Sequence, residues 1–276
     1  MILPALRGEM VKLYHQRIVW AGVAMVLVLV ILVVWGSHHE RDRFDAGEMI
    51  GSEFIVTGNT VTALFVARAV MQVALVVFVP MLIAVVAGAM VAGERQLGTL
   101  RTLLSRPVRR STVLLSKLAA AWSYAVLLTL LLGLSALALG QLVFGWGDLV
   151  VLRQGLTIFD PQTGLMRLAQ GYALAALAMG TVATVALMLS AIVDNPMTAA
   201  GLTVAFLLIS QIVAVMPYFE SIEPHLLTTH LDIFNRVFAP AIETGRVWRS
   251  VAYLSGYSVV ATVVALVVFG RRDVTS

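Results

Sequence analysis

Residues 18–36 read IVWAGVAMVLVLVILVVWG, an unbroken apolar run with no Asp, Glu, Lys or Arg. A helix needs roughly 20 such residues to cross the hydrocarbon core of a bilayer, so this run is long enough to span a membrane. It is longer than the apolar core of a secretory signal peptide, and the following WGSHHERD (residues 35–42) offers no small-residue cleavage site. The run therefore predicts a retained transmembrane helix.

The rest of the chain repeats this pattern. Five further apolar runs of similar length contain no Asp, Glu, Lys or Arg: residues 69–92, 118–143, 168–193, 199–216 and 251–270. The chain is 60% hydrophobic and 12% charged, whereas a soluble domain has about 25% charged residues. It has no cysteine, which excludes disulfides and thiolate metal sites. We expect an all-α membrane protein in which residues 1–276 form a single transmembrane domain with six spans.

The distribution of Lys and Arg predicts how the spans are oriented. With the N-terminus inside, six spans also leave the C-terminus inside. The inner segments then hold eleven basic and four acidic residues, and eight of the 19 basic and eleven of the 15 acidic residues lie outside. Because basic residues favour the cytoplasmic side, we expect a multi-pass protein of the cell's inner (cytoplasmic) membrane with both termini in the cytoplasm.

Apolar residues also recur at helical spacing before the first span, at Leu3, Leu6, Met10, Leu13 and Tyr14, with charged residues between them. This pattern predicts an N-terminal amphipathic helix in the inner membrane surface. The simpler alternative is a short helical lead-in to the first span.

The connecting segments carry weaker signals. The sequence FDPQTG (159–164) marks a turn, and the apolar stretches before it suggest a small hairpin. Asn195 before Pro196 predicts a tight turn between spans 4 and 5. Residues 225–238 look helical and are expected on the outer surface. The five histidines lie outside the spans or at their ends, and each is expected to be a solvated loop residue.

The densest positive charge lies in GERQLGTLRTLLSRPVRRSTVLLSK, residues 93–117. Thr99 can cap a short helix that Pro107 should end. Leu100, Leu103 and Leu104 would form its apolar face. One interpretation is an anchor for anionic lipid headgroups.

This stretch also resembles a signature of the type-2 ABC exporter permeases. In that family an acidic residue after span 2 is followed by Gly-Thr, Leu-Leu, a Pro-Val-Arg element and an apolar run ending in Lys. The matching residues here are Glu94, Gly98-Thr99, Leu103-Leu104, Pro107-Val108-Arg109 and Lys117. The six spans and the N-terminal EMVKLYHQR (residues 9–17) also resemble that family.

The resemblance implies that the segment is a cytoplasmic coupling helix, which docks into a separate ABC ATPase subunit. The residues that it assigns to partner coupling are Glu94, Gly98, Thr99, Leu100, Leu103, Leu104, Pro107 and Arg109. It further implies two ATPase copies, which hold ATP and Mg, and a second permease copy or a related permease. Whether Glu94 pairs with Arg95, Arg101 or a partner residue stays open.

No G-x-x-x-x-G-K-[ST] loop occurs, so no ATP site is expected in this chain. We expect no catalytic, cofactor or metal residues and no nucleic-acid partner. The predicted function is therefore the permease subunit of an exporter, with a hydrophobic or amphipathic substrate. The alternatives are an ion- or proton-driven carrier, an intramembrane enzyme and a non-transporting membrane scaffold. A carrier usually has ionisable residues within its spans, and here the predicted spans offer only Gln and hydroxyl groups.

Overall fold

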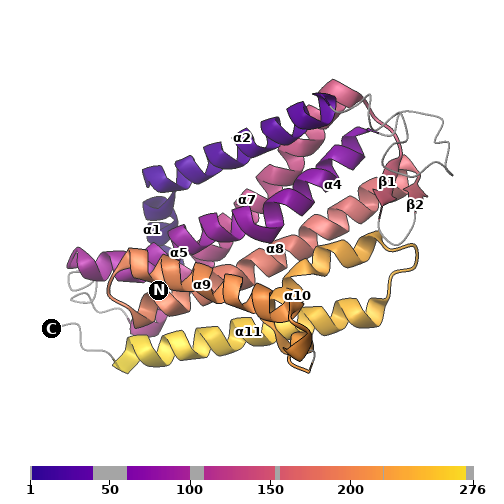
Figure 1. Ribbon diagram of the computed structural model, residues 1–276. Coiled ribbons are helices and arrows are strands. Elements are labelled where there is room, and N and C mark those ends of the chain that lie inside the picture. The colour runs from indigo at the N-terminus through magenta and orange to yellow at the C-terminus, as the bar shows by residue number, and fades with distance from the viewer. Residues whose placement is uncertain (1, 40–60, 100–108, 153–155, 220, 272–276) are drawn as a thin grey trace.

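The computed structural model describes residues 2–39, 61–99, 109–152, 156–219 and 221–271. Six helices in these ranges are long and apolar enough to cross a membrane, and they lie side by side in one bundle (Figure 1). They are α2 (Arg17–His39), the continuous helix Ala63–Gln96, α7 (Arg110–Phe144), α8 (Pro161–Ile192), α9 (Pro196–Val215) and α11 (Thr244–Arg271). Each overlaps a predicted span, so the expectation of an all-α, multi-pass membrane protein is confirmed.

The bundle has two distinct ends, which we call the α1 end and the hairpin end. The α1 end, at the left of Figure 1, contains α1 (Ile2–Tyr14), the last turn of α5 (Val79–Gln96) and the first turn of α7. At the opposite end lie β1 (Leu149–Leu152) and β2 (Leu156–Phe159). These strands pair antiparallel, with Leu149 opposite Phe159, which confirms the predicted hairpin.

Side-chain caps define where two of the spans begin. The Asp160 carboxylate accepts a hydrogen bond from the Thr163 N–H, and Pro161 occupies the first position of α8. The Asn195 side chain likewise accepts from the Met197 N–H, and Pro196 opens α9. Proline suits this position because the N–H that it lacks would have no partner within the helix. The predicted tight turn between spans 4 and 5 is therefore confirmed.

The second span is not a uniform α-helix. It consists of α4 (Ala63–Val73), a π-helical segment η1 (Ala74–Phe78) and α5. Pro80 is the second residue of α5, just after the π-helical segment, and it supplies no N–H to the helix. This segment interrupts the regular hydrogen-bond pattern between the two α-helical parts of the span.

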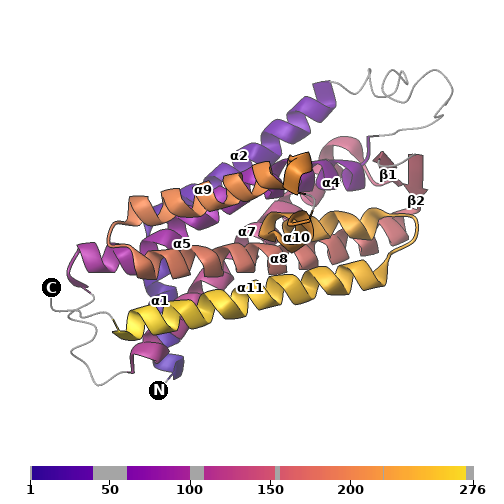
Figure 2. The ribbon, with the colours of Figure 1, turned by 60° about the horizontal axis from the view of Figure 1, so that its bottom comes forward.

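α8 is the central helix of the bundle, and Figure 2 shows it between α9 and α11. In its most apolar 18-residue window, 72% of the residues are buried, against 17% for α9 and for α11. Small residues let the neighbouring helices approach it closely. A Cβ added to Gly180 would lie 2.6 Å from the Trp122 ring, and one added to Gly171 would lie 3.2 Å from Met71.

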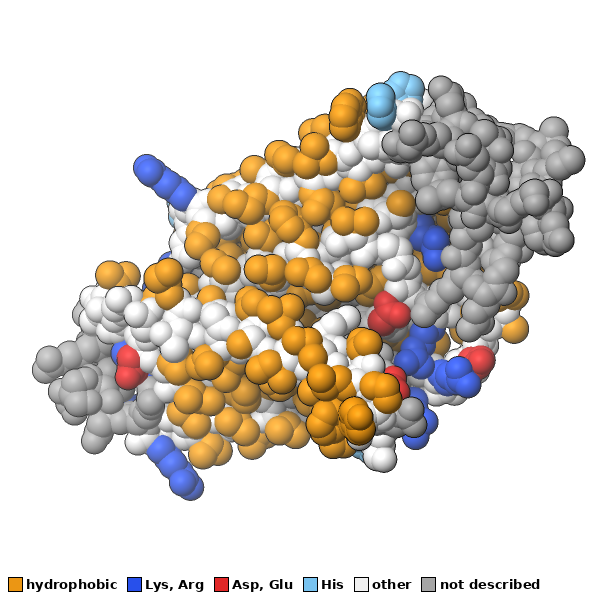
Figure 3. Space-filling view, in the orientation of Figure 1, with side chains coloured by type: hydrophobic (Ala, Val, Ile, Leu, Met, Phe, Trp, Pro, Cys, Tyr) orange, Lys and Arg blue, Asp and Glu red, His pale blue; other side chains and the backbone are white. Residues whose placement is uncertain are grey.

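Apolar side chains also cover the outside of the bundle. In Figure 3 they occupy its middle, whereas Lys, Arg, Asp and Glu gather toward the two ends. Exposed Trp20, Met25, Ile31 and Trp35 belong to this band on α2. Within lipid an exposed apolar face has favourable surroundings, so this distribution agrees with a membrane-spanning bundle.

The segment between α9 and α11 differs from its prediction. It contains η2 (Pro217–Phe219), η3 (Glu223–His225), α10 (Leu227–Leu231) and η4 (Asp232–Phe238). It is helical as expected, and η2 and η3 are exposed, but α10 and η4 pack into the bundle and do not lie on the surface. Five apolar residues of α10 and η4 are almost completely buried, namely Leu227, Ile233, Phe234, Val237 and Phe238.

Polar groups hold this segment in place. The amide of Asn235 pairs with that of Gln72 on α4, and Asn235 is only 5% exposed. Gln72 therefore serves the packing of this segment against α4. His230 is 3% exposed, so the prediction of a solvated histidine was wrong at this position. The sequence shows no signal that this polar segment turns inward.

Candidate coupling site at the α1 end

Helix α1 packs across the start of α7. Its residue Leu13 is 1% exposed, and the Tyr14 hydroxyl lies 3.1 Å from the Ser123 hydroxyl of α7. The Trp20 indole N–H donates to the Tyr14 carbonyl over 2.8 Å, which fixes the turn between α1 and α2. The opposite face remains exposed at Leu3 and Val11. α1 is thus bound to the bundle along one face only.

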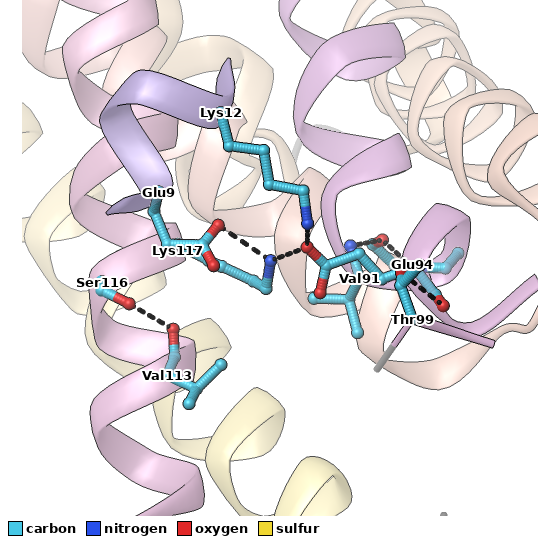
Figure 4. Close-up of polar contacts among 10 residues, drawn as sticks. Glu9, Lys12, Val91, Glu94, Thr99, Val113, Ser116 and Lys117 are labelled. Atoms are coloured by element: carbon cyan, nitrogen blue, oxygen red, sulfur yellow. Dashed lines mark hydrogen bonds and ion pairs between the residues drawn. The ribbon is translucent and has the colours of Figure 1, made fainter. Parts of the chain in front are cut away.

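Four charged side chains meet where α1, α5 and α7 come together (Figure 4). Lys117 of α7 is 1% exposed, and its Nζ lies 2.9 Å from Glu9 Oε2 and 2.6 Å from Glu94 Oε1. Lys12 also donates to Glu94 Oε1. The charges alternate in the order Glu9, Lys117, Glu94, Lys12, so the group is neutral overall. We call these four residues the ion cluster.

Because the ion cluster is buried, its stability depends on how closely the charges are paired. Removing charged groups from water costs several kcal/mol per ion, and only close pairing offsets this cost. Glu9 and Glu94 are 8% and 6% exposed, and both contact Lys117. Half of the Lys12 side chain is exposed, so its contact with Glu94 is the weakest part of the cluster. Lys117 is thus the residue on which the cluster depends.

Arg95, the next residue after Glu94, holds the opposite side of α5. Its guanidinium donates to the carbonyls of Val193 and Ala191 over 3.1 Å and 3.4 Å. It also forms a 2.8 Å ion pair with Asp194. These carbonyls lie at the C-terminal end of α8, where the backbone lacks intrahelical donors and a cation is favoured. Two consecutive residues therefore join the end of α5 to α1 and α7 on one side and to the α8–α9 turn on the other.

The structure describes four of the eight predicted coupling residues. Glu94 is in the ion cluster, and Gly98 has φ +69°, a left-handed conformation that allows the sharp turn expected there. The Thr99 hydroxyl donates to the Glu94 carbonyl over 3.2 Å. Arg109 has an extended backbone and precedes α7. Leu100, Leu103, Leu104 and Pro107 lie outside the described residues.

The sequence interpretation missed how the site is assembled. Lys117 was recognised only as the end of a motif, whereas its side chain pairs with the residue at the other end. Glu9 and Lys12 were assigned to the polar face of an interfacial helix. One signal was available, because Glu9 lies three residues after Leu6 and four before Leu13 and therefore shares their face of a helix. A carboxylate on an apolar face is stabilised by a cation that packs against the same face.

A cavity of about 400 Å³ adjoins the ion cluster. Its lining comes from α1, α5, α7 and the residues after α5, and it includes Leu13, Gln16, Met90, Leu97 and all four cluster residues. Within the described ranges, no three His, Asp or Glu side chains come together in a way that could hold a metal ion. The ion pairs of Lys117 with Glu9 and Glu94 make this site a charged junction between α1, α5 and α7.

The fold and this junction define a multi-pass α-helical membrane protein. Residues 26–275 match the family described as "Protein of unknown function (DUF2705)", and the chain belongs to that family. It is similar to the "Uncharacterized protein YhcI" of Bacillus subtilis (strain 168), with 28% identity over 199 residues. This match covers 70% of the chain and 63% of the Bacillus protein, so the chain spans less than two thirds of that relative's length.

Proposed function

We propose that this chain is the permease subunit of an ATP-binding-cassette exporter. The segment between α5 and α7 would dock on a separate ATPase subunit, and the α1 end would face the cytoplasm. The substrate would be hydrophobic or amphipathic, as expected from a bundle with apolar spans. Two ATPase copies and a second permease copy or a related permease would complete the transporter.

The observation that carries this proposal is the contact between Glu94 and Lys117. These two residues stand on either side of the connection from α5 to α7, and they meet as a buried ion pair. A segment that receives force from a soluble partner needs firmly held ends, because loose ends would absorb the displacement. Glu94, Arg95 and Lys117 supply such ends for residues 97–109.

The proposal also accounts for the polar and basic character of the segment. A connection that served only as a tight turn would need few residues, whereas residues 97–109 include three arginines and four leucines. A short amphipathic helix with an apolar face suits a groove on a soluble protein. The sequence resemblance to type-2 exporter permeases supports the same role.

One observation favours a second candidate, an ion- or proton-driven carrier. Buried ionisable residues are typical of carriers, and Lys117 is almost fully buried with two carboxylates. The position of the ion cluster argues against this function, however. Between Leu118 and Phe144 of α7, and between Leu168 and Ile192 of α8, the sequence has no Asp, Glu, Lys or Arg. A proton path through the centre of the bundle would therefore lack ionisable groups on these two helices.

The test is direct binding to an ATPase. An ATPase that co-purifies with the chain is produced separately, and its affinity for the chain in lipid nanodiscs is measured. Leu103→Asp should abolish binding, because a carboxylate forced into an apolar groove has no partner and costs several kcal/mol. Leu3→Asp is the matched control, since Leu3 is exposed on α1. Equal affinity of the Leu103→Asp and unaltered chains would contradict docking by this face.

Arg109→Gln separates docking from a lipid anchor. Arg109 is exposed, whereas Arg110 donates to the Gly270 carbonyl and is less suitable for this comparison. An arginine at an anionic membrane surface contributes about 1 kcal/mol. Arg109→Gln should therefore reduce the dependence on anionic lipid and leave ATPase binding nearly unchanged.

The carrier alternative has its own test. Transport that needs no ATP and that a protonophore abolishes would favour the ion- or proton-driven carrier.

A further inference from the structure

The hydroxyl group of Ser190 on α8 is inserted against the backbone of α5. It donates to the Gly88 carbonyl over 2.5 Å and accepts from the N–H groups of Val91 and Ala92, over 3.1 Å and 2.9 Å. A hydroxyl has one hydrogen to donate and two lone pairs to accept, so all of its capacity goes to one turn of α5. Ser190 is completely buried.

This turn of α5 is the point where three helices meet. In a regular helix the Ala92 N–H would donate to the Gly88 carbonyl, and Ser190 bridges these same two groups. On its other side Gly88 faces α9, where an added Cβ would lie 3.0 Å from the Ala200 nitrogen. Ser190 therefore adds a partner from α8 to backbone groups that belong to the regular hydrogen-bond ladder of α5.

We propose that Ser190 and Arg95 are positioning residues that make α8 move together with the end of α5. Arg95 hydrogen-bonds to the α8–α9 turn, and Ser190 hydrogen-bonds to the backbone of α5 about one turn before Glu94. Displacement of the connection after α5 is thus passed to α8, the most buried span. The inference rests on the proposed function only in naming the ATPase as the source of that displacement.

The link to α7 is of a different kind. At this end, Glu94 of α5 forms an ion pair with Lys117 of α7, so this polar link joins the ends of two long side chains. The link to α8 instead includes three bonds from a short side chain to the helix backbone. A serine has one rotatable side-chain torsion before its hydroxyl, whereas a lysine has four, so Ser190 permits less relative motion.

The experiment measures distances within the purified chain in nanodiscs, without any ATPase. The chain has no cysteine, so spin labels can be attached at Leu97→Cys and Met166→Cys to follow α5 against α8. Both side chains are exposed. From Met166 to Ser190 α8 extends about 36 Å, so the two labels lie at a separation that pulsed electron paramagnetic resonance can measure. A second pair, Leu97→Cys and Leu134→Cys, follows α5 against α7.

Two Ser190 variants with side chains of the same shape test the hydroxyl. Both are made together with Arg95→Gln, which removes the other polar link between α5 and the end of α8. Ser190→Val removes the hydroxyl, and the Leu97–Met166 distance distribution should broaden and shift. Ser190→Thr keeps the hydroxyl and should retain a narrow distribution. Ser116→Ala is a control for loss of a buried hydroxyl, because the Ser116 hydroxyl donates to the Val113 carbonyl of its own helix. It should leave the distribution unchanged.

The α7 pair completes the comparison. Lys117→Met should broaden the Leu97–Leu134 distribution and leave the Leu97–Met166 distribution narrow. If Ser190→Val and Ser190→Thr give equal distributions, whether both narrow or both broad, the positioning role of Ser190 is overturned. That result would leave docking on the ATPase unaffected, and failure to dock would leave the distance comparison intact.

Discussion

Glu94 Oε1 lies 2.6 Å from Lys117 Nζ, and both side chains are buried at the α1 end of the bundle. The contact joins the last turn of α5 to the start of α7, on either side of the connection between them. Glu9 extends it to α1 through a 2.9 Å contact with the same ammonium group. One lysine thus joins three helices.

Lys117→Met should destabilise the folded chain strongly. It leaves Glu9 and Glu94 buried without their shared cation, and loss of one partner of a buried ion pair costs about 3–5 kcal/mol. Thermal or denaturant unfolding in detergent measures the loss. Lys12→Met is the control, because Lys12 is half exposed and its loss should cost no more than about 1 kcal/mol. Equal stability of the two variants would show that the ion cluster does not support the fold.

Gly180→Ala should destabilise the bundle through steric overlap. An added Cβ would lie 2.6 Å from the Trp122 ring, and Trp122 is held by a 2.9 Å hydrogen bond from its indole N–H to the Thr184 hydroxyl. Overpacking of this kind costs about 1–3 kcal/mol. The midpoint of thermal unfolding should fall for Gly180→Ala and not for Gly201→Ala, where an added Cβ meets nothing within 4 Å. A tolerated Gly180→Ala would mean that Trp122 can move aside.

The six spans and the turn at Pro196 could be predicted because their signals are local. Apolar runs of membrane length, caps and prolines act within a few residues of the structure that they determine. The ion cluster could not be predicted from the sequence, because Glu9 and Lys117 lie 108 positions apart and meet only through packing of α1 on α7. The prediction that residues 225–238 lie on the outer surface was wrong for a related reason. Their helical pattern was evident, but burial depends on α8 and on the partner amide of Gln72.

The orientation prediction can be tested with single cysteines at the two ends of the bundle. Thr244→Cys at the start of α11 should react with a membrane-impermeant thiol reagent added to intact cells. Ser111→Cys at the start of α7 should react only after the cells are opened. Both positions are exposed, so the difference measures sidedness and not burial. Reaction of Ser111→Cys in intact cells, with protection of Thr244→Cys, would reverse the orientation and remove access of the α5–α7 connection to a cytoplasmic ATPase.

His230 should make the stability of the chain fall in mild acid. It lies outside the six spans, where its ring stacks on Tyr253 at 4.3 Å. Its Nε2–H donates to the Pro224 carbonyl, and its Nδ1 accepts from the Ser250 hydroxyl, which satisfies the neutral ring. Burial lowers the pKa of His230, with a smaller contribution from the positive charges of Arg236 and Arg249.

The sign of the effect follows from this lowered pKa. In the unfolded chain the histidine has a pKa of about 6.5, so it binds a proton there before the folded form does. The stabilising contribution is complete above about pH 6.5 and is lost as the pH falls through the lower folded pKa. His230→Gln should make the midpoint of thermal unfolding less dependent on pH in this range. His15→Gln, at an exposed position of the α1–α2 turn, should leave the pH dependence of the midpoint unchanged. An equal slope for the His230→Gln and unaltered chains would assign the acid sensitivity to other groups.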